Sequence, residues 1–218
     1  MAERGSWSSI ERFGLLSTTA LLDLFEIAGD ARVAIESVHR PESVSIRHPV
    51  HGTAWIRDNQ PINQTVLRRT LAGMTEPEWY RSLNGRVFFW LSERRLAKMR
   101  AASLYSEREH DILVFSTESL LSAHAETVEL SPINSGAVHA GCKISRSARI
   151  FRSISEYPWL ERVRVAPRDP IVEFTVAYAV PNVSRHVIDV CTERRSAVIT
   201  DTSAHRGVNN CLFPYSVE

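Results

Sequence analysis

The chain has 218 residues, of which 44% are hydrophobic and 23% are charged, and its formal net charge at pH 7 is +1. This composition predicts one globular domain, or two small ones, that can fold without metal or disulfide bonds. The near-neutral charge gives no bulk electrostatic reason to expect nucleic acid or a membrane as a partner.

The cysteines and the apolar runs bear on location and on metal binding. Cys142, Cys191 and Cys211 are far apart and odd in number, and no pair has the spacing of a metal site, which favours reduced thiols. No apolar run reaches the length of a membrane span, and the first ten residues are too polar for a signal peptide. We therefore expect a cytoplasmic protein with no membrane partner and no metal.

The first half of the chain is predicted to be mainly helical. Helical spacing of apolar residues predicts a helix that Ser17 caps and Gly29 ends, and further helices over residues 62–73 and 75–83. Asn84-Gly85 is expected to supply a left-handed stop after the third helix. Residues 30–61 are predicted to be irregular or only briefly extended.

The second half is predicted to alternate strands with short helices. Apolar runs predict strands over residues 86–91, 111–115, 126–130, 171–178 and 186–191, with helices over 92–103 and 117–124 and a turn at 131–136. The order has no regular βαβ rhythm, which favours an α+β fold with a mixed or antiparallel sheet. We expect a single domain over residues 1–218, with a poorly ordered tail after about residue 195.

Three residue types stand out as candidates for binding or chemistry. Arg57 precedes a predicted helix start and could hold a phosphate or a carboxylate, or form a solvated pair with Asp58. Phe89 and Trp90 could stack on a ligand ring or belong to the core. Glu173 interrupts an apolar strand, where a carboxylate is costly to bury unless it is paired or functional. The alternative for Glu173 is the exposed face of an edge strand.

A series of short segments, taken in chain order, resembles the DarT-like branch of the ADP-ribosyltransferases over about residues 5–191. The resemblance is carried by Phe13-Gly14-Leu15-Leu16-Ser17, Ile56-Arg57-Asp58, Val87-Phe88-Phe89-Trp90, Glu173-Phe174-Thr175-Val176, Val180-Pro181 and Val187-Ile188-Asp189-Val190. The Asn-x-Arg-Val-Phe-Phe-Trp core is also similar to that of other bacterial proteins. The histidine of the family's first strand should lie just before Met1.

The resemblance implies a mixed or antiparallel sheet core with flanking helices and an NAD-dependent mono-ADP-ribosyltransferase activity. Glu173 would then stabilise the positively charged, oxocarbenium-like ribose of the transition state. Arg57 would hold the diphosphate or assist proton removal at the acceptor. Phe89 or Trp90 would stack on nicotinamide, and Leu16 and Ser17 would belong to the NAD-binding turn.

The acceptor implied by the resemblance is a nucleic-acid base on single-stranded DNA or RNA. Asn134 and Ser135 would contact it, although such a segment also reads as a simple turn. Arg149 and Arg152, with Arg146 and Arg162, Arg164 and Arg168, would track its phosphates, or form a solvated basic face. A toxin–antitoxin setting with an antitoxin partner would follow. Two alternatives remain: a non-catalytic nucleotide- or nucleic-acid-binding domain on the same fold, and an unrelated α+β interaction protein.

Overall fold

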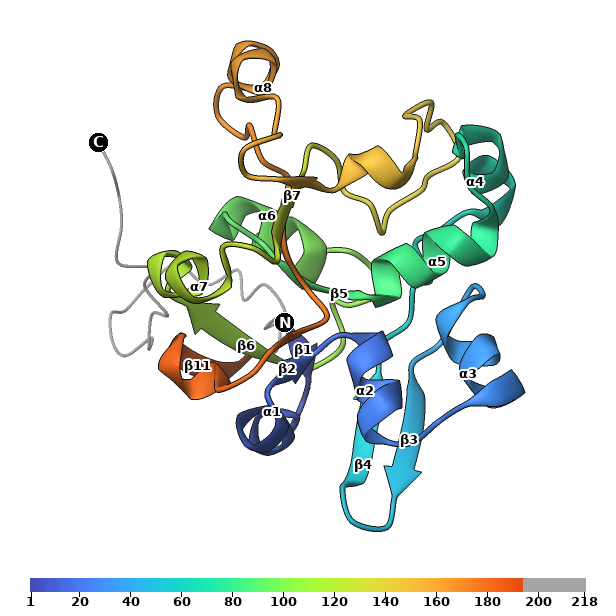
Figure 1. Cartoon of the computed structure of the whole chain (residues 1–218), viewed down its shortest axis with the longest axis vertical. Helices are drawn as coiled ribbons and strands as arrows, with labels where there is room; N and C mark the ends of the chain where they lie inside the picture. The colour runs from blue at the N-terminus through green and yellow to red at the C-terminus, as the bar shows by residue number, and fades with distance from the viewer. Residues whose placement is uncertain (194–218) are drawn as a thin grey trace, which may run out of the picture.

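The computed structural model describes residues 1–193 and shows a mixed α+β architecture (Figure 1). The predicted α+β class is therefore confirmed, and every pairing between the named strands of this region is antiparallel. No helix within residues 1–193 is long and apolar enough to cross a membrane. The prediction of a poorly ordered tail falls outside the described residues.

The strands of residues 1–193 form two sheets and two isolated pairs. One sheet has the order β5 (Arg86–Phe89), β9 (Glu173–Ala177), β7 (Val128–Ser131), β8 (Arg152–Ser153). The other has the order β1 (Ala2–Glu3), β6 (His110–Phe115), β11 (Val187–Glu193). The pairs are β2 (Leu15–Leu16) with β10 (Ala179–Val180), and β3 (Val44–His48) with β4 (Gly52–Ile56).

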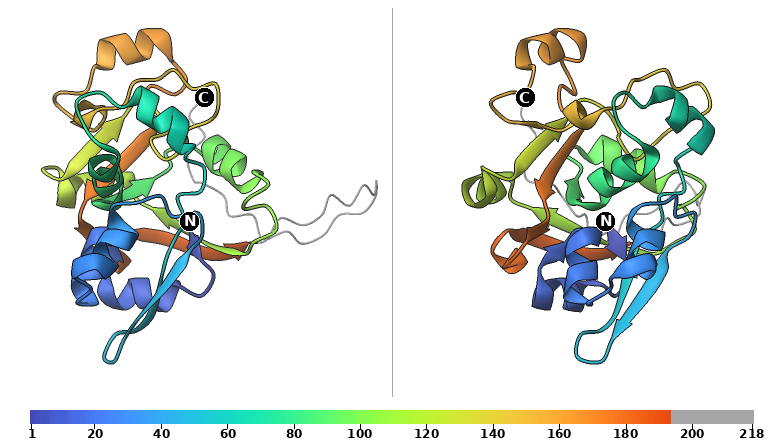
Figure 2. Two further views of the ribbon diagram at one scale, coloured as in Figure 1. Left: turned by 90° about the vertical axis from the view of Figure 1, so that its right-hand side faces the viewer. Right: turned by 45° about the vertical axis from the view of Figure 1, so that its right-hand side comes forward.

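Helices surround these sheets. They are α1 (Trp7–Phe13), α2 (Thr18–Leu24), α3 (Gly29–Glu36), α4 (Gln64–Thr70), α5 (Glu76–Asn84), α6 (Glu93–Arg100), α7 (Thr117–His124) and α8 (Trp159–Val165), with short 3-10 turns at Ala148–Ile150 and Val183–Arg185. Helix α8 and the β3–β4 hairpin project from opposite ends of the molecule in every view (Figures 1 and 2).

Side-chain caps explain where several helices begin. Ser17 accepts a hydrogen bond from the Ala20 amide at the start of α2, as predicted. Thr75 and Glu78 form a reciprocal capping box at the start of α5. The short helix α7 is capped by Ser116 and not by Thr117. Each cap satisfies a backbone N–H group that has no partner within the helix.

Three expectations for the first half are corrected. Residues 30–61 contain the short extended segments that were predicted, as the β3–β4 hairpin, but they also contain most of α3, which was not predicted. Gly29 begins this helix, whereas it was expected to end one. The buried residue of α3 is an acid, Glu36. The sequence of α3 therefore lacks the stripe of apolar residues from which a helix is predicted. Gly85 has a φ of −82°, so it does not form the left-handed stop expected after α5.

Apolar side chains in the described region gather in three core clusters. One joins α4 and α5 to the segment after β7, the second packs between β7, β9 and α7, and the third lies between α2 and the β3–β4 hairpin. Their largest members include Trp79, Phe174 and Phe25.

Gly14 is expected to tolerate no side chain. Its φ is +89°, and a Cβ atom built on it would lie 2.9 Å from the Val180 carbonyl oxygen in the β2–β10 pair. Gly14→Ala should therefore lower the free energy of unfolding by about 2 kcal/mol, as measured by urea denaturation. Gly141→Ala is the matched control, because nothing lies within 4 Å of its Cβ position. Equal effects of the two substitutions would contradict this account.

Candidate active site

A cleft of about 1920 Å³ lies between the two sheets. Its lining comes from β1, β4, β5, β6, β9, α6 and the turn over residues 132–137. The candidate site residues that line it are Leu16, Ser17, Arg57, Phe89, Trp90, Asn134, Ser135, Arg146 and Glu173. Arg149 and Arg152 are not part of the lining.

Glu173 is the buried acid of this cleft. It begins β9, which lies between β5 and β7, and the residue is 4% exposed. The alternative interpretation of an exposed edge strand is therefore wrong. The Ser135 amide donates a hydrogen bond to Oε1 at 3.1 Å. Glu173 Oε2 is buried and has no hydrogen-bond partner among the described residues, so one carboxyl oxygen keeps an unused capacity to accept a hydrogen bond.

Burial raises the pKa of Glu173 from its usual value of 4.5 to about 7. The Ser135 hydrogen bonds and the positive charge of Arg95 on α6 act in the opposite direction. A carboxyl group whose pKa lies near neutrality, with an unpaired oxygen and a place in the lining of a cleft, is typical of a functional site.

Arg57 follows β4 and has one nitrogen available in the same cleft. Its Nη2 is buried without a hydrogen-bond partner in the part of the chain that the structure describes. Its Nη1 donates weakly to the Met1 carbonyl at 3.5 Å, and its Nε lies 3.7 Å from Glu3 Oε1. The guanidinium also lies 5.1 Å from the centre of the Tyr105 ring. This leaves Arg57 a free donor for an anionic ligand.

Asp58 does not form the solvated pair with Arg57 that the sequence left open. Its side chain is 1% exposed, accepts a hydrogen bond from the Tyr105 hydroxyl at 3.0 Å and lies 3.6 Å from Arg108. Helix α4 is capped by Asn63, six residues after Arg57, so neither Asp58 nor Asn59 begins it. Arg57 therefore does not lie at a helix N-terminus, as was expected, and only its own side chain could contribute to an anion site.

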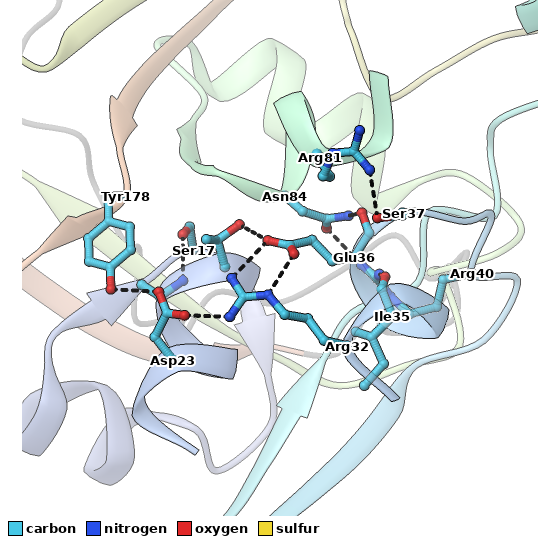
Figure 3. A network of polar contacts seen from close by, with 12 residues as sticks. Ser17, Asp23, Arg32, Ile35, Glu36, Ser37, Arg40, Arg81, Asn84 and Tyr178 are labelled. Atoms are coloured by element: carbon cyan, nitrogen blue, oxygen red, sulfur yellow. Dashed lines mark hydrogen bonds and ion pairs between the residues drawn. The ribbon is translucent and has the colours of Figure 1, made fainter. Parts of the chain in front are cut away.

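Arg40 is a site residue that the sequence did not reveal. It is 6% exposed and its Nε donates to the Arg57 carbonyl at 2.7 Å. Its Nη groups donate to the Ile35 carbonyl and to Asn84 Oδ1 (Figure 3). Burial lowers the pKa of Arg40 to about 10, which leaves it charged at neutral pH. Arg40 thereby fixes the backbone that carries Arg57.

A second polar network joins α2, which contributes to the cleft lining, to α3 behind it. Arg32 pairs with both Asp23 and Glu36, and the Tyr178 hydroxyl donates to Asp23 at 2.8 Å (Figure 3). The hydrogen bond from Arg32 is the largest cause that lowers the pKa of Asp23. The Tyr178 carbonyl also accepts from the Ser17 amide. This network connects the turn before α2 to Tyr178, which follows β9 at the end opposite Glu173.

The aromatic candidates differ in their surroundings. Phe89 packs edge-on against Phe115 and Phe174, with ring centres 5.1 and 5.7 Å apart, so it serves the core as well as the cleft. Trp90 is half-buried in the lining. Trp55, which the sequence analysis did not select as a candidate, also lines the cleft and is 54% exposed. Phe88 lines the cleft as well and is 39% exposed. Trp55, Phe88 and Trp90 are therefore aromatic side chains of the lining that are open to stacking.

The remaining predicted site residues have structural roles or lie elsewhere. The Ser17 side chain caps α2, and Leu16 pairs with Ala179 between β2 and β10. Arg152 donates to the Arg149 carbonyl at 3.1 Å, away from the cleft lining. Arg146, expected on a basic surface, is 1% exposed. The predicted basic groove therefore loses Arg146, and Arg149 and Arg152 remain as partly exposed side chains outside the cleft.

Comparison with known proteins gives one match. The profile of the family described as "Family of unknown function (DUF7002)" matches residues 1–187. No curated protein and no solved structure matches the chain.

Proposed function

The chain belongs to DUF7002, a family of unknown function, and from the geometry of its cleft we propose that it is an NAD-dependent mono-ADP-ribosyltransferase. The fold proposed with this activity is the ADP-ribosyltransferase-like arrangement of a sheet core with flanking helices. The observation that carries the proposal is Glu173, a buried carboxyl on a central strand with one oxygen unpaired in a large cleft.

Glu173 supplies the charge that the reaction needs. Cleavage between nicotinamide and ribose passes through a sugar with oxocarbenium-like positive charge, and a fixed carboxylate beside it lowers the barrier. The Ser135 amide holds one oxygen of Glu173, which leaves Oε2 for the ribose and its 2′-hydroxyl. Because the ionised form is the active one, a pKa of about 7 makes the rate increase with pH through neutrality.

Arg57 is assigned to the diphosphate of NAD. Its buried Nη2 lacks a partner among the described residues, and Arg40 holds its backbone. Trp90 and Trp55 offer ring faces to nicotinamide or to the acceptor, and Asn134 is an exposed amide at the cleft. The acceptor in this proposal is a nucleic-acid base, and an antitoxin is the partner that would restrain the activity.

Arg57→Gln should weaken the binding of ADP-ribose by about 10- to 100-fold, since a charge-assisted hydrogen bond to phosphate contributes roughly 1.5–3 kcal/mol. ADP-ribose contains the diphosphate but cannot be turned over, so isothermal titration calorimetry measures binding alone. Arg47→Gln, on the exposed part of the β3–β4 hairpin, is the matched control and should bind normally. Unchanged affinity in Arg57→Gln would remove Arg57 from the site.

A non-catalytic nucleotide-binding domain is the second candidate. It is favoured by the raised pKa of Glu173, which leaves about half of the molecules without a negative charge at pH 7. Under this alternative, ADP-ribose and NAD bind, but no ADP-ribose is transferred to any acceptor. Calorimetry and transfer measurements on the same preparation separate the two candidates.

A further inference from the structure

Arg146 is a buried cation with an unusual set of partners. It is 1% exposed, and its Nη groups donate to the Ile144 and Ala137 carbonyls, both at 2.9 Å. Its Nη1 also lies 3.4 Å from the sulfur of Cys142, and its Nε has no hydrogen-bond partner among the described residues. Within residues 1–193, no carboxylate lies at ion-pair distance from Arg146.

The charge of Arg146 needs a counter-charge. A guanidinium stays protonated in proteins, and burial without an anionic partner is unfavourable. The two carbonyl oxygens that accept from Arg146 are neutral, whereas the third acceptor, Cys142, can ionise. Cys142 is therefore the group that can neutralise the buried guanidinium, by losing its proton.

The surroundings of Cys142 favour the thiolate for a second, independent reason. No acid occurs between Glu129 and Glu156, whereas Lys143 directly follows Cys142. Cys142 is partly exposed and lines the cleft. Reactive cysteines occupy such electropositive, partly exposed positions. The hydrogen bond from Arg146 is the largest cause that holds the pKa of Cys142 below its usual value.

We propose that Cys142 is a thiolate held by Arg146 and a modification site, at the cleft, for small electrophiles of the hydroperoxide and alkylating classes. With a hydroperoxide, the sulfur attacks one peroxide oxygen and the O–O bond breaks. The sulfur becomes a sulfenic acid, and the leaving oxygen takes a proton and departs as water or alcohol. With an alkyl halide, a C–S bond forms and the halide ion leaves.

Modification at Cys142 affects both the cleft and the stability of its wall. An adduct would occupy the cleft lining shared with Asn134 and His139. A neutral adduct also removes the anion from Arg146, whose backbone joins the Thr70–Ala72 segment through hydrogen bonds of 2.7 and 2.8 Å. The proposal does not depend on NAD chemistry, so it can hold or fail independently of the proposed function.

The first test is the pH dependence of alkylation in the full chain with Cys211 replaced by serine. Iodoacetamide is added between pH 6 and 9, and peptide mass spectrometry gives separate rates for Cys142 and Cys191. The midpoint of the Cys142 rate should lie below the ordinary thiol value of about 8.5. Each unit by which the pKa of Cys142 is lowered should raise the alkylation rate at pH 7 about threefold. The thiolate fraction increases about tenfold, but a thiolate of lower pKa is a weaker nucleophile, which offsets part of the gain. A midpoint at or above 8.5 would overturn the proposal.

The second test asks whether Arg146 is the cause. Arg146→Met should return the midpoint to the ordinary range, while Arg146→Lys should keep it lowered. If Arg146→Met does not fold, the role of Arg146 can be tested with two adducts of Cys142 in the protein that keeps Arg146. The carboxymethyl adduct from iodoacetate keeps a negative charge near Arg146, whereas the carbamidomethyl adduct from iodoacetamide is neutral.

The carboxymethylated protein should therefore melt at a higher temperature than the carbamidomethylated protein. Both experiments use the chain with Cys211 replaced by serine. The same pair of reagents applied to Cys142→Ser in that background, where only Cys191 can react, should give no such difference. Equal melting temperatures for the two Cys142 adducts would overturn the ion pair with Arg146.

Discussion

Glu173→Gln is expected to make the protein more stable than the wild type above pH 7, by up to about 3 kcal/mol in the free energy of unfolding. The folded carboxyl keeps its proton up to about pH 7, whereas the unfolded chain releases it near 4.5. The wild type therefore loses stability as the pH rises from about 4.5 to 7, at roughly 1.4 kcal/mol for each unit of the pKa shift. Glutamine has no proton to lose and still accepts the Ser135 hydrogen bond.

Urea denaturation at pH 5 and pH 8 measures this difference. At pH 5 the variant and the wild type should be nearly equal, since both carry a neutral side chain at position 173. Glu42→Gln is the control, because Glu42 is exposed and its replacement should have the same small effect at both pH values. A stability difference for Glu173→Gln that does not change between pH 5 and 8 would show that the carboxyl is not buried in the way described.

Arg40→Met is expected to lower the free energy of unfolding by about 3 kcal/mol. Methionine fills much of the space of the buried stem, but it leaves the Arg57 carbonyl, the Ile35 carbonyl and Asn84 Oδ1 without the donor that Arg40 supplies. A buried acceptor that loses its partner costs about 1–3 kcal/mol. Because Arg40 fixes the backbone of Arg57, the affinity for ADP-ribose should fall as well.

Chemical denaturation and calorimetry test both parts of this expectation. Arg47→Met on the exposed hairpin is the matched control and should change stability by less than about 0.5 kcal/mol. Arg40→Lys should recover only part of the loss, because a single ammonium cannot reach three separate acceptors. A loss below 1 kcal/mol for Arg40→Met would mean that water replaces the guanidinium and that Arg40 does not hold the segment.

Much of the fold was predictable where local chemistry decides it. Ser17 was identified as a helix cap from neighbouring residues alone. The apolar run before Ser92 and the one after Pro170 predicted β5 and β9 because both strands are buried. Helix α3 was missed because its stability comes from tertiary polar contacts, those of Arg32 and Glu36, which leave no apolar periodicity.

The candidate site was predictable only in part, for the same reason. Glu173 was conspicuous as an acid within an apolar run, and the structure places it in a cleft with Arg57. Arg40 gave no signal, because its role depends on acceptors from three other segments. Arg146 was expected on a surface from its basic neighbours, but it is buried with Cys142. A sequence gives the charge of an arginine but not its burial.

Transfer of label from NAD tests the central claim most directly. Wild type, Glu173→Gln and Glu42→Gln are incubated at pH 6 and pH 8 with NAD labelled on its adenylate and with single-stranded DNA, RNA and protein as acceptors. The account predicts label on nucleic acid, a rate about tenfold higher at pH 8 than at pH 6, and at least a ~100-fold loss in Glu173→Gln alone. Equal transfer by Glu173→Gln, or no transfer and no NAD binding by the wild type, would contradict it.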